Sequence, residues 1–331
     1  MDNIRTNTNA SASLLGWDFQ INAAIVLFML NLKAAKSVRV EGKVEDIEIT
    51  LNDNTKIYSQ AKHVADPENN NTVRTHLINA LRTLNTASRQ SDIRSLIYVT
   101  NSPNPFSDKR TMAYFTRRTE LSYIELPTLC KNKIHELIEK YQYIELDVNK
   151  LMVNVIPFYG INEENKYKEI RSVVEDTLAD LKIDTLGVAK NILYRWQRYF
   201  FQNATEVSIT VELSKKELLW ALIVTIMESP DSIKYKIDYS DDDLEFIKDR
   251  YLKVINNETL NFELITRVLY DYKKSKTIAT KFIEDNWINY MDVVEMLNDD
   301  NETLSVVVKM ILYKILVKRD SINRIKMEVG L

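Results

Sequence analysis

An acid, an amide and a lysine occur at spacings that could bring their side chains together on two neighbouring strands. Residues 38–63 alternate polar and apolar side chains on either side of a polar turn at 52–55. Asp46 lies on the first strand, and Gln60 and Lys62 share one face of the second because side chains alternate along a strand. The hairpin therefore predicts a carboxylate, an amide oxygen and an ammonium within reach of one another.

This combination suits metal-assisted hydrolysis of a phosphodiester. Asp46, the Gln60 side chain and a nearby backbone carbonyl would supply the oxygen ligands that Mg²⁺ or Mn²⁺ prefers. Lys62 would orient the attacking water or offset the negative charge of the transition state. Metal ligands are therefore expected at Asp46 and Gln60.

A solvated strand face is the alternative interpretation for Gln60 and Lys62. The acids nearby are harder to explain in that way, because Glu45, Asp46 and Glu48 fall within four residues and repel one another. A bound cation or a facing lysine would relieve the repulsion. Glu45 is therefore included among the candidate catalytic residues.

The hairpin is expected between two helices and before a buried strand. A helix over about residues 13–34 has an apolar centre at 21–32, which is too short to span a bilayer and predicts a buried helix. A second helix is expected over 73–89 and a buried strand over 95–99. On the first helix, Gln20 either orients a water or ligand of the site or is a polar position on an otherwise buried helix.

Basic residues are concentrated between positions 60 and 120, where nine lysines and arginines face five acids in a chain of net charge −3. Such an excess suits sequence-independent binding of phosphates. An ordinary solvated helix face is the alternative. The candidate DNA contacts are Arg74, Arg82, Lys109, Arg117 and Arg118.

A series of five motifs resembles one nuclease family. Asp46, separated by thirteen residues from Gln60-Ala61-Lys62, is similar to the D…QxK variant of the PD-(D/E)xK nucleases found in Mrr-like enzymes. The longer series resembles the double-strand DNA endonuclease domain of CBASS anti-phage effectors and of the Lamassu nuclease subunit. Its members are Gly16-Trp17-Asp18-Phe19-Gln20, Glu41, Glu45-Asp46, Gln60-Ala61-Lys62 and Thr100-Asn101.

The resemblance implies an α/β restriction-endonuclease-like N-terminal domain, over residues 13–125, that cleaves double-stranded DNA with Mg²⁺. Within it, the first-helix acid of the wider superfamily is Gln20 here, so this helix is expected to act without binding the metal directly. The Lamassu arrangement further implies an SMC-like ATPase complex that restrains the nuclease. A homo-oligomer, dimer or tetramer, is expected in the active form, because a double-strand break requires two active sites.

The rest of the chain predicts helix after helix, that is, an all-α C-terminal domain over 161–331 after a connecting region at 126–160. We expect this domain to regulate the nuclease and to bind partner subunits through the aromatic run 194–201 and the amphipathic helix 304–317. Residues 1–12 are expected to form a flexible leader.

Composition narrows the functional class. The 331-residue chain has one cysteine and three histidines, which excludes an internal disulfide, makes a zinc site improbable and suits the cytoplasm. None of its five glycines builds a phosphate-binding loop, so an ATPase is not expected. The alternative function is a catalytically inactive nuclease fold that acts as a DNA- or protein-binding adaptor.

Overall fold

The computed structural model describes residues 9–66, 69–160, 162–183, 187–228, 241–256 and 261–330. The chain divides into two compact units. The first unit comprises Met1–Thr177 and Leu193–Lys215, and the second comprises Leu178–Ile192 and Lys216–Leu331.

The first unit is built on a mixed sheet, which in the described residues has seven strands in the order β5-β6-β4-β3-β2-β1-β7. β1, β2 and β3 are antiparallel neighbours, β3, β4 and β6 are parallel, and β5 and β7 are antiparallel edge strands. The strands are β1 (Ala35–Val40), β2 (Ile47–Leu51), β3 (Lys56–Lys62), β4 (Ile93–Thr100), β5 (Thr119–Ser122), β6 (Leu151–Val155) and β7 (Leu213–Ser214). The order of the first elements, helix, three strands, helix and strand, is the order predicted from the sequence.

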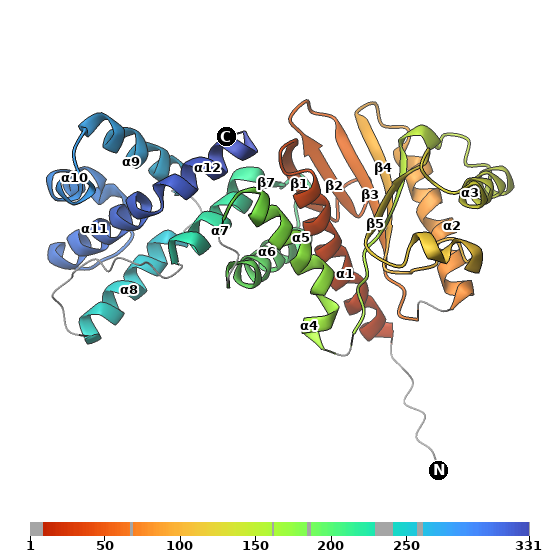
Figure 1. Cartoon of the computed structure of the whole chain (residues 1–331), viewed down its shortest axis with the longest axis horizontal. Coiled ribbons are helices and arrows are strands. Elements are labelled where there is room, and N and C mark those ends of the chain that lie inside the picture. The colour runs from red at the N-terminus through yellow and green to blue at the C-terminus, as the bar shows by residue number, and fades with distance from the viewer. Residues whose placement is uncertain are drawn as a thin grey trace, which may run out of the picture. The chain divides into compact units, whose positions relative to one another are not determined.

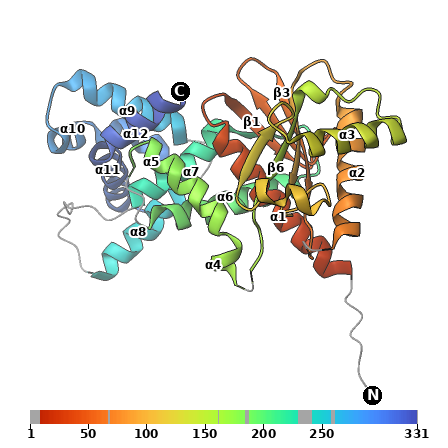
Figure 2. The same ribbon diagram turned by 45° about the vertical axis from the view of Figure 1, so that its right-hand side comes forward.

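Helices α1 (Asn9–Leu30) and α2 (Asn70–Ala87) cover opposite faces of the sheet (Figure 1 and Figure 2). In α1, the window Ser13–Leu30 is long and apolar enough to cross a membrane by length and composition, but 61% of it is buried inside the protein. The burial arises because α1 packs on β1, β2 and β3. α2 begins at Asn69, whose side chain accepts a hydrogen bond from the Thr72 amide.

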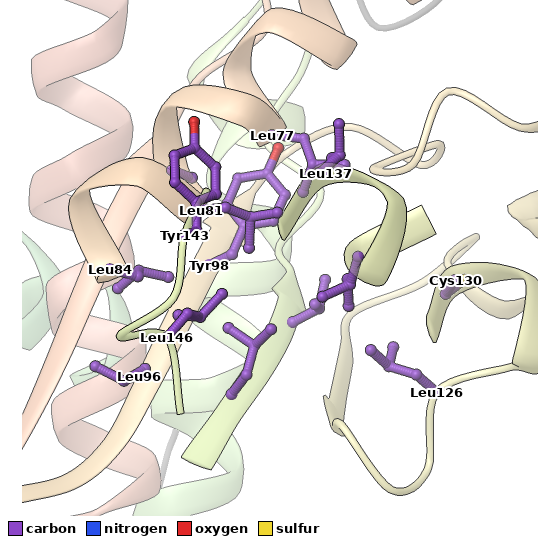
Figure 3. Packing of buried hydrophobic residues seen from close by; sticks show 14 of the residues in the cluster. Leu77, Leu81, Leu84, Leu96, Tyr98, Leu126, Cys130, Leu137, Tyr143 and Leu146 are labelled. Atoms are coloured by element: carbon purple, nitrogen blue, oxygen red, sulfur yellow. The ribbon is translucent and has the colours of Figure 1, made fainter. Parts of the chain in front are cut away.

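A hydrophobic core cluster fills the space between the sheet and the helices α2 and α3 (Thr128–Tyr141) (Figure 3). α2 contributes Leu77, Leu81 and Leu84 at helical spacing, and β4 contributes Leu96 and Tyr98 from alternate positions. This packing fixes α2 against the face of β3 and β4 to which the even-numbered residues 58, 60 and 62 point. Two 3₁₀ turns, η1 (Lys109–Tyr114) and η2 (Val148–Lys150), connect the remaining strands.

Buried hydrogen bonds join residues 203–214 to the sheet of the first unit. The Arg39 guanidinium, on β1, donates to the carbonyl oxygens of Asn203, Glu206 and Val211 at 2.6 to 3.0 Å. The Asn203 side chain in turn accepts from the Val40 amide at 2.9 Å. Arg39 thus supplies three hydrogen bonds to this chain segment, which is therefore part of the structure built on the sheet.

The helices that follow are distributed between the two units. They are α4 (Glu163–Lys166), α5 (Lys168–Asp180), α6 (Val188–Thr205), α7 (Lys215–Glu228), α8 (Asp241–Ile255), α9 (Asn261–Ser275), α10 (Ala279–Asn286), η3 (Trp287–Val294), α11 (Asn301–Val317) and α12 (Arg319–Val329). In the second unit α11 packs against α8, α9, α10, η3 and α12. The predicted partner helix 304–317 is therefore a core element, and its side chains Val307, Ile311 and Ile315 are buried.

The structure corrects three predicted boundaries. Residues 9–12 of the predicted leader begin α1, and residues 1–8 lie outside the described residues. The predicted connecting region 126–160 supplies α3 and the strand β6, whose hydrogen bonds to β4 and β5 make it part of the sheet. The predicted all-α region 161–331 contains β7, which pairs with β1. The first unit thus extends well beyond residue 125.

Candidate active site

Asp46, Gln60 and Lys62 come together at one corner of the sheet. Asp46 immediately precedes β2, and the pairing of Ile47 with Ser59 places it beside the last residues of β3. Its Oδ2 accepts hydrogen bonds from Gln60 Nε2 and from the Ala61 amide at 3.1 Å. The Lys62 ammonium lies 3.7 Å from the same oxygen. The predicted grouping of these three side chains is therefore present in the structure.

The turn before β2 holds Asp46 in place. Its backbone closes through a hydrogen bond from the Glu41 amide to the Asp46 carbonyl at 2.7 Å. Glu48 accepts from the Val44 amide at 2.6 Å, and a Cβ at Gly42 would lie 2.4 Å from the same Glu48 oxygen. The Glu48 carboxylate therefore holds the backbone of the turn through hydrogen bonds, and only a glycine at position 42 leaves room for that carboxylate.

Gln20 ties α1 to this turn. Its Nε2 donates to Glu41 Oε1 at 2.8 Å and to the Asp46 carbonyl at 3.1 Å, and its side chain is buried. Gln20 thus fixes the backbone that carries the Asp46 carboxylate. In the structure the amide nitrogen of Gln20 is thus directed to the turn.

Glu45 is a buried acid at the same corner. The side chain is 5% exposed, and its Oε1 has no hydrogen-bond partner among the described residues. Burial, and after it the charge of Asp46, raises the pKa of Glu45 to about 8. Burial likewise raises the pKa of Asp46, against the lowering effect of Lys62. Both acids therefore hold a proton more readily than the same groups would in water.

One flank of α2 faces the site, and the sequence reasoning missed it. Thr83 donates from Oγ1 to Gln60 Oε1 at 2.5 Å, and its hydroxyl also lowers the pKa of Glu45. His76, two helical turns earlier, is close enough to Lys62 for that charge to add to burial in lowering the histidine's pKa. The seven-residue spacing of His76 and Thr83, both polar on an amphipathic helix, is the signal that could have identified this flank.

Arg74 and Arg82 lie on the other side of α2. The pKa of Glu136 of α3 is lowered mainly by its hydrogen bond with Lys133, and the nearby charge of Arg74 adds to this effect. Burial raises the pKa of Tyr143, and the nearby charge of Arg82 opposes that rise. At about 100° per residue, Arg74 points about 160° away from His76. These two predicted DNA contacts are exposed, but they do not face the Asp46 corner.

Arg117 and Arg118 precede β5 at the same end of the sheet as Lys62. The pairing register runs from Lys62 to Thr100, from Thr100 to Val155 and from Val155 to Thr119. Three strand spacings amount to about 14 Å. The pair therefore lies close enough to the site for one duplex to contact both, whereas Lys109 lies in η1 and is exposed.

The oxygen donors fit a hard divalent cation. Asp46 and the unpartnered Glu45 oxygen offer carboxylate donors, which with water and substrate phosphate suit Mg²⁺. The Gln60 amide oxygen, which accepts from Thr83 in the structure, would add a carbonyl donor once the amide turned over. Among the described residues no group of three or more His, Cys, Asp or Glu side chains is placed to hold a metal. The site therefore suits an ion that is coordinated by only one or two protein carboxylates.

A cavity of about 580 Å³ lies elsewhere on the first unit. Its lining residues include Asp53, Arg94 and Lys150, at the opposite ends of the strands from Gln60 and Lys62. It contains none of the predicted site residues.

The raised pKa of Glu45 has a measurable consequence. Between its unfolded value near 4.5 and its folded value of about 8, the folded chain holds a proton that the unfolded chain has lost. Its contribution to stability is therefore complete below pH 4.5 and is lost as the pH rises through 8. For Glu45→Gln we expect a free energy of unfolding roughly 2 kcal/mol above wild type at pH 9, with little difference at pH 4.5.

The measurement is urea unfolding between pH 4.5 and 9 in EDTA. Glu139→Gln, at an exposed position of α3, is the matched control and should follow the wild-type pH dependence. An unchanged pH dependence in Glu45→Gln would show that the buried proton is not on Glu45.

Comparisons with known proteins give one structural neighbour. No protein-family model and no curated protein matches the chain. Among solved structures, the chain is similar to the Cap4 SAVED/CARF-domain containing receptor of Moraxella osloensis, with 13% identity and a TM-score of 0.37. The match covers 72% of this chain and 60% of that one. A similarity of this degree carries no argument about activity, which rests on the geometry of the site.

Proposed function

We propose that the first unit is a metal-dependent endonuclease of the PD-(D/E)xK class that cleaves double-stranded DNA. The observation that carries the proposal is the convergence of Asp46, Gln60 and Lys62 at one corner, beside the unpartnered oxygen of Glu45. The predicted order of elements and the D…QxK spacing agree with this class.

Each residue has a role that its position supports. Asp46 and Gln60, with Glu45, would hold Mg²⁺ or Mn²⁺, and the ion would polarise the phosphate and activate a water. Lys62 would donate to that water or to the phosphate and offset developing negative charge. Gln20 holds the turn that carries Asp46, and Arg117 and Arg118 bind the DNA backbone on the same sheet edge.

We further propose that the enzyme serves prokaryotic antiviral defence, on the basis of the five-motif resemblance. A nuclease that contacts mainly phosphates would also cut host DNA, so its activity must be restrained. An SMC-like ATPase complex would restrain it, and release followed by oligomerisation would activate it. On α6, Tyr194 and Phe201 are exposed while Trp196 and Phe200 are buried, so the first pair is the part of the aromatic run available to a partner.

A second candidate, an inactive nuclease fold that binds DNA or partners, is favoured by one observation. The Asp46 Oδ2 accepts from Gln60 and from the Ala61 amide and lies against the Lys62 ammonium, so protein groups alone can satisfy this oxygen. A fold whose only function was binding would keep such a closed arrangement.

Plasmid cleavage separates the two candidates. We expect purified chain, at concentrations that allow oligomers, to linearise supercoiled plasmid with Mg²⁺ or Mn²⁺ and to leave it intact with EDTA. DNA retention without any cleavage under every metal condition would support the adaptor and contradict the nuclease. Cleavage that persists in EDTA would contradict the metal-dependent mechanism.

A further inference from the structure

The Gln60 amide bridges α2 and the Asp46 carboxylate. One of its atoms, Oε1, lies 2.5 Å from Thr83 Oγ1, and the other, Nε2, contacts Asp46 Oδ2. Gln60 is 3% exposed, so neither end of the amide can turn to bulk water instead. Whether the Asp46 carboxylate contacts the amide NH₂ or the amide oxygen therefore depends on which of the two faces Thr83.

The Thr83 hydroxyl can form a hydrogen bond with either the oxygen or the NH₂ group of the Gln60 amide. It has one proton and two lone pairs. In one arrangement it donates to Gln60 Oε1, and the amide NH₂ faces Asp46. In the other it donates to the Ala80 carbonyl, which lies 3.1 Å away, and accepts from the amide NH₂. The amide oxygen then faces the Asp46 carboxylate.

The two arrangements suit different states of the site. With the NH₂ group toward Asp46, the carboxylate is satisfied without a metal. With the oxygen toward Asp46, two oxygen acceptors meet, and this contact is favourable only when a cation lies between them. The second arrangement also presents two oxygen ligands to that cation.

We propose that Thr83 is a positioning residue that lets the Gln60 amide turn over when a divalent cation binds. The inference rests on the cation site of the proposed function. In the cation-free chain Thr83 donates to Gln60, and in the loaded chain it accepts from Gln60. The buried amide is thus hydrogen-bonded in both states, and the chain folds without metal.

A threonine in a helix often bonds only the preceding turn, so the contact with Gln60 is what distinguishes Thr83. Thr86, three residues later on α2, is exposed, and its hydroxyl donates to the Arg82 carbonyl at 3.3 Å. It has the helix bond without the contact to Gln60, which makes it a matched control.

Mn²⁺ binding to the full chain, measured by electron paramagnetic resonance without DNA, tests the proposal. Thr83→Val has nearly the same shape but can neither donate nor accept. It removes one hydrogen bond from the cation-free arrangement and two from the loaded one, so we expect about 10-fold loss of Mn²⁺ affinity. Thr83→Ser keeps the hydroxyl and should stay within about threefold of wild type, as should Thr86→Val. Equal affinity in Thr83→Val and wild type, or failure of Thr83→Ser to retain affinity, would overturn the proposal.

The side-chain NH₂ signal of Gln60 gives a second readout that does not depend on the valine variant. In ¹⁵N-glutamine-labelled wild type, the resonance lost in Gln60→Glu identifies it, and Mg²⁺ titration should shift it strongly. A Gln60 signal that stays in place while Mg²⁺ binds contradicts the turning of the amide. Wild-type chain that binds neither ion overturns the proposed function itself, and this inference with it.

Discussion

Lys62→Ala is expected to lower plasmid cleavage by about 10³-fold, because the ammonium is the positive group placed to offset charge on the reacting phosphate. Asp46→Ala should abolish cleavage completely, because it removes a carboxylate ligand of the metal ion. Initial rates of loss of supercoiled plasmid in Mg²⁺, at equal protein concentrations, measure both effects.

The loss should not arise from unfolding. The Lys62 side chain is 28% exposed and its ion pair with Asp46 is 3.7 Å long, so its removal should cost less than about 1 kcal/mol. Asp46 keeps its hydrogen bonds to Gln60 and to the Ala61 amide in this variant. The melting temperature of Lys62→Ala should therefore remain close to that of wild type.

Lys56→Ala is the matched control. Lys56 is on the same strand and the same face as Lys62, has a side chain 24% exposed, and pairs with Glu48 at 3.5 Å. This variant reproduces the loss of a strand lysine and of an ion pair, and Lys56 takes no part in the bonds that join Asp46, Gln60 and Lys62. Full cleavage by Lys62→Ala, or equal loss in Lys56→Ala, would contradict the assigned role of Lys62.

Strand periodicity carried most of the site prediction. Alternation along β3 placed Gln60 and Lys62 on one face, and hairpin pairing brought Asp46 opposite to them. Glu48 shows where alternation is insufficient. The sequence indicated only that Glu48 repels Asp46 and Glu45, whereas in the structure its carboxylate reaches back to the amides of Val44 and Glu45. A turn's internal hydrogen bonds are not encoded in a two-residue period.

Contacts between distant elements could not be predicted from local pattern. Thr83 reaches Gln60 only because the apolar face of α2 fixes the helix's rotation on the sheet. Gln20 reaches Glu41 only because the Glu41 backbone adopts a left-handed conformation, with φ of 55°. A non-glycine residue rarely adopts it, so no propensity rule would place it there.

The end of the first unit was missed for a similar reason. β7 has two residues, too few for a periodic signal, and its attachment depends on the buried hydrogen bonds of Arg39 with the 203–211 segment. From the sequence alone, a charged residue such as Arg39 on a short strand is predicted to be exposed to solvent. Its burial became visible only when residues more than 160 positions away were placed around it.

Mixing wild-type chain with an excess of Lys62→Ala should convert double-strand breaks into nicks. The described residues contain one Asp46–Gln60–Lys62 cluster per chain, and one cluster cuts one strand. The two strands of a duplex are antiparallel, so cutting both calls for two copies related by a twofold axis. At one wild-type chain in ten, random pairing gives about 1% wild-type pairs and about 18% mixed pairs.

Co-expression with two different affinity tags provides the mixed pairs, and agarose gels separate nicked circles from linear DNA. We expect nicked circles to dominate with Lys62→Ala, and linear DNA to dominate when Lys56→Ala replaces it as the excess chain. A dimer of active sites makes linear product fall with the square of the wild-type fraction, whereas a chain that cuts both strands alone makes it fall in direct proportion. The second dependence would contradict control by oligomerisation while leaving the Asp46 and Lys62 chemistry intact, because each active chain would still cleave through the same residues.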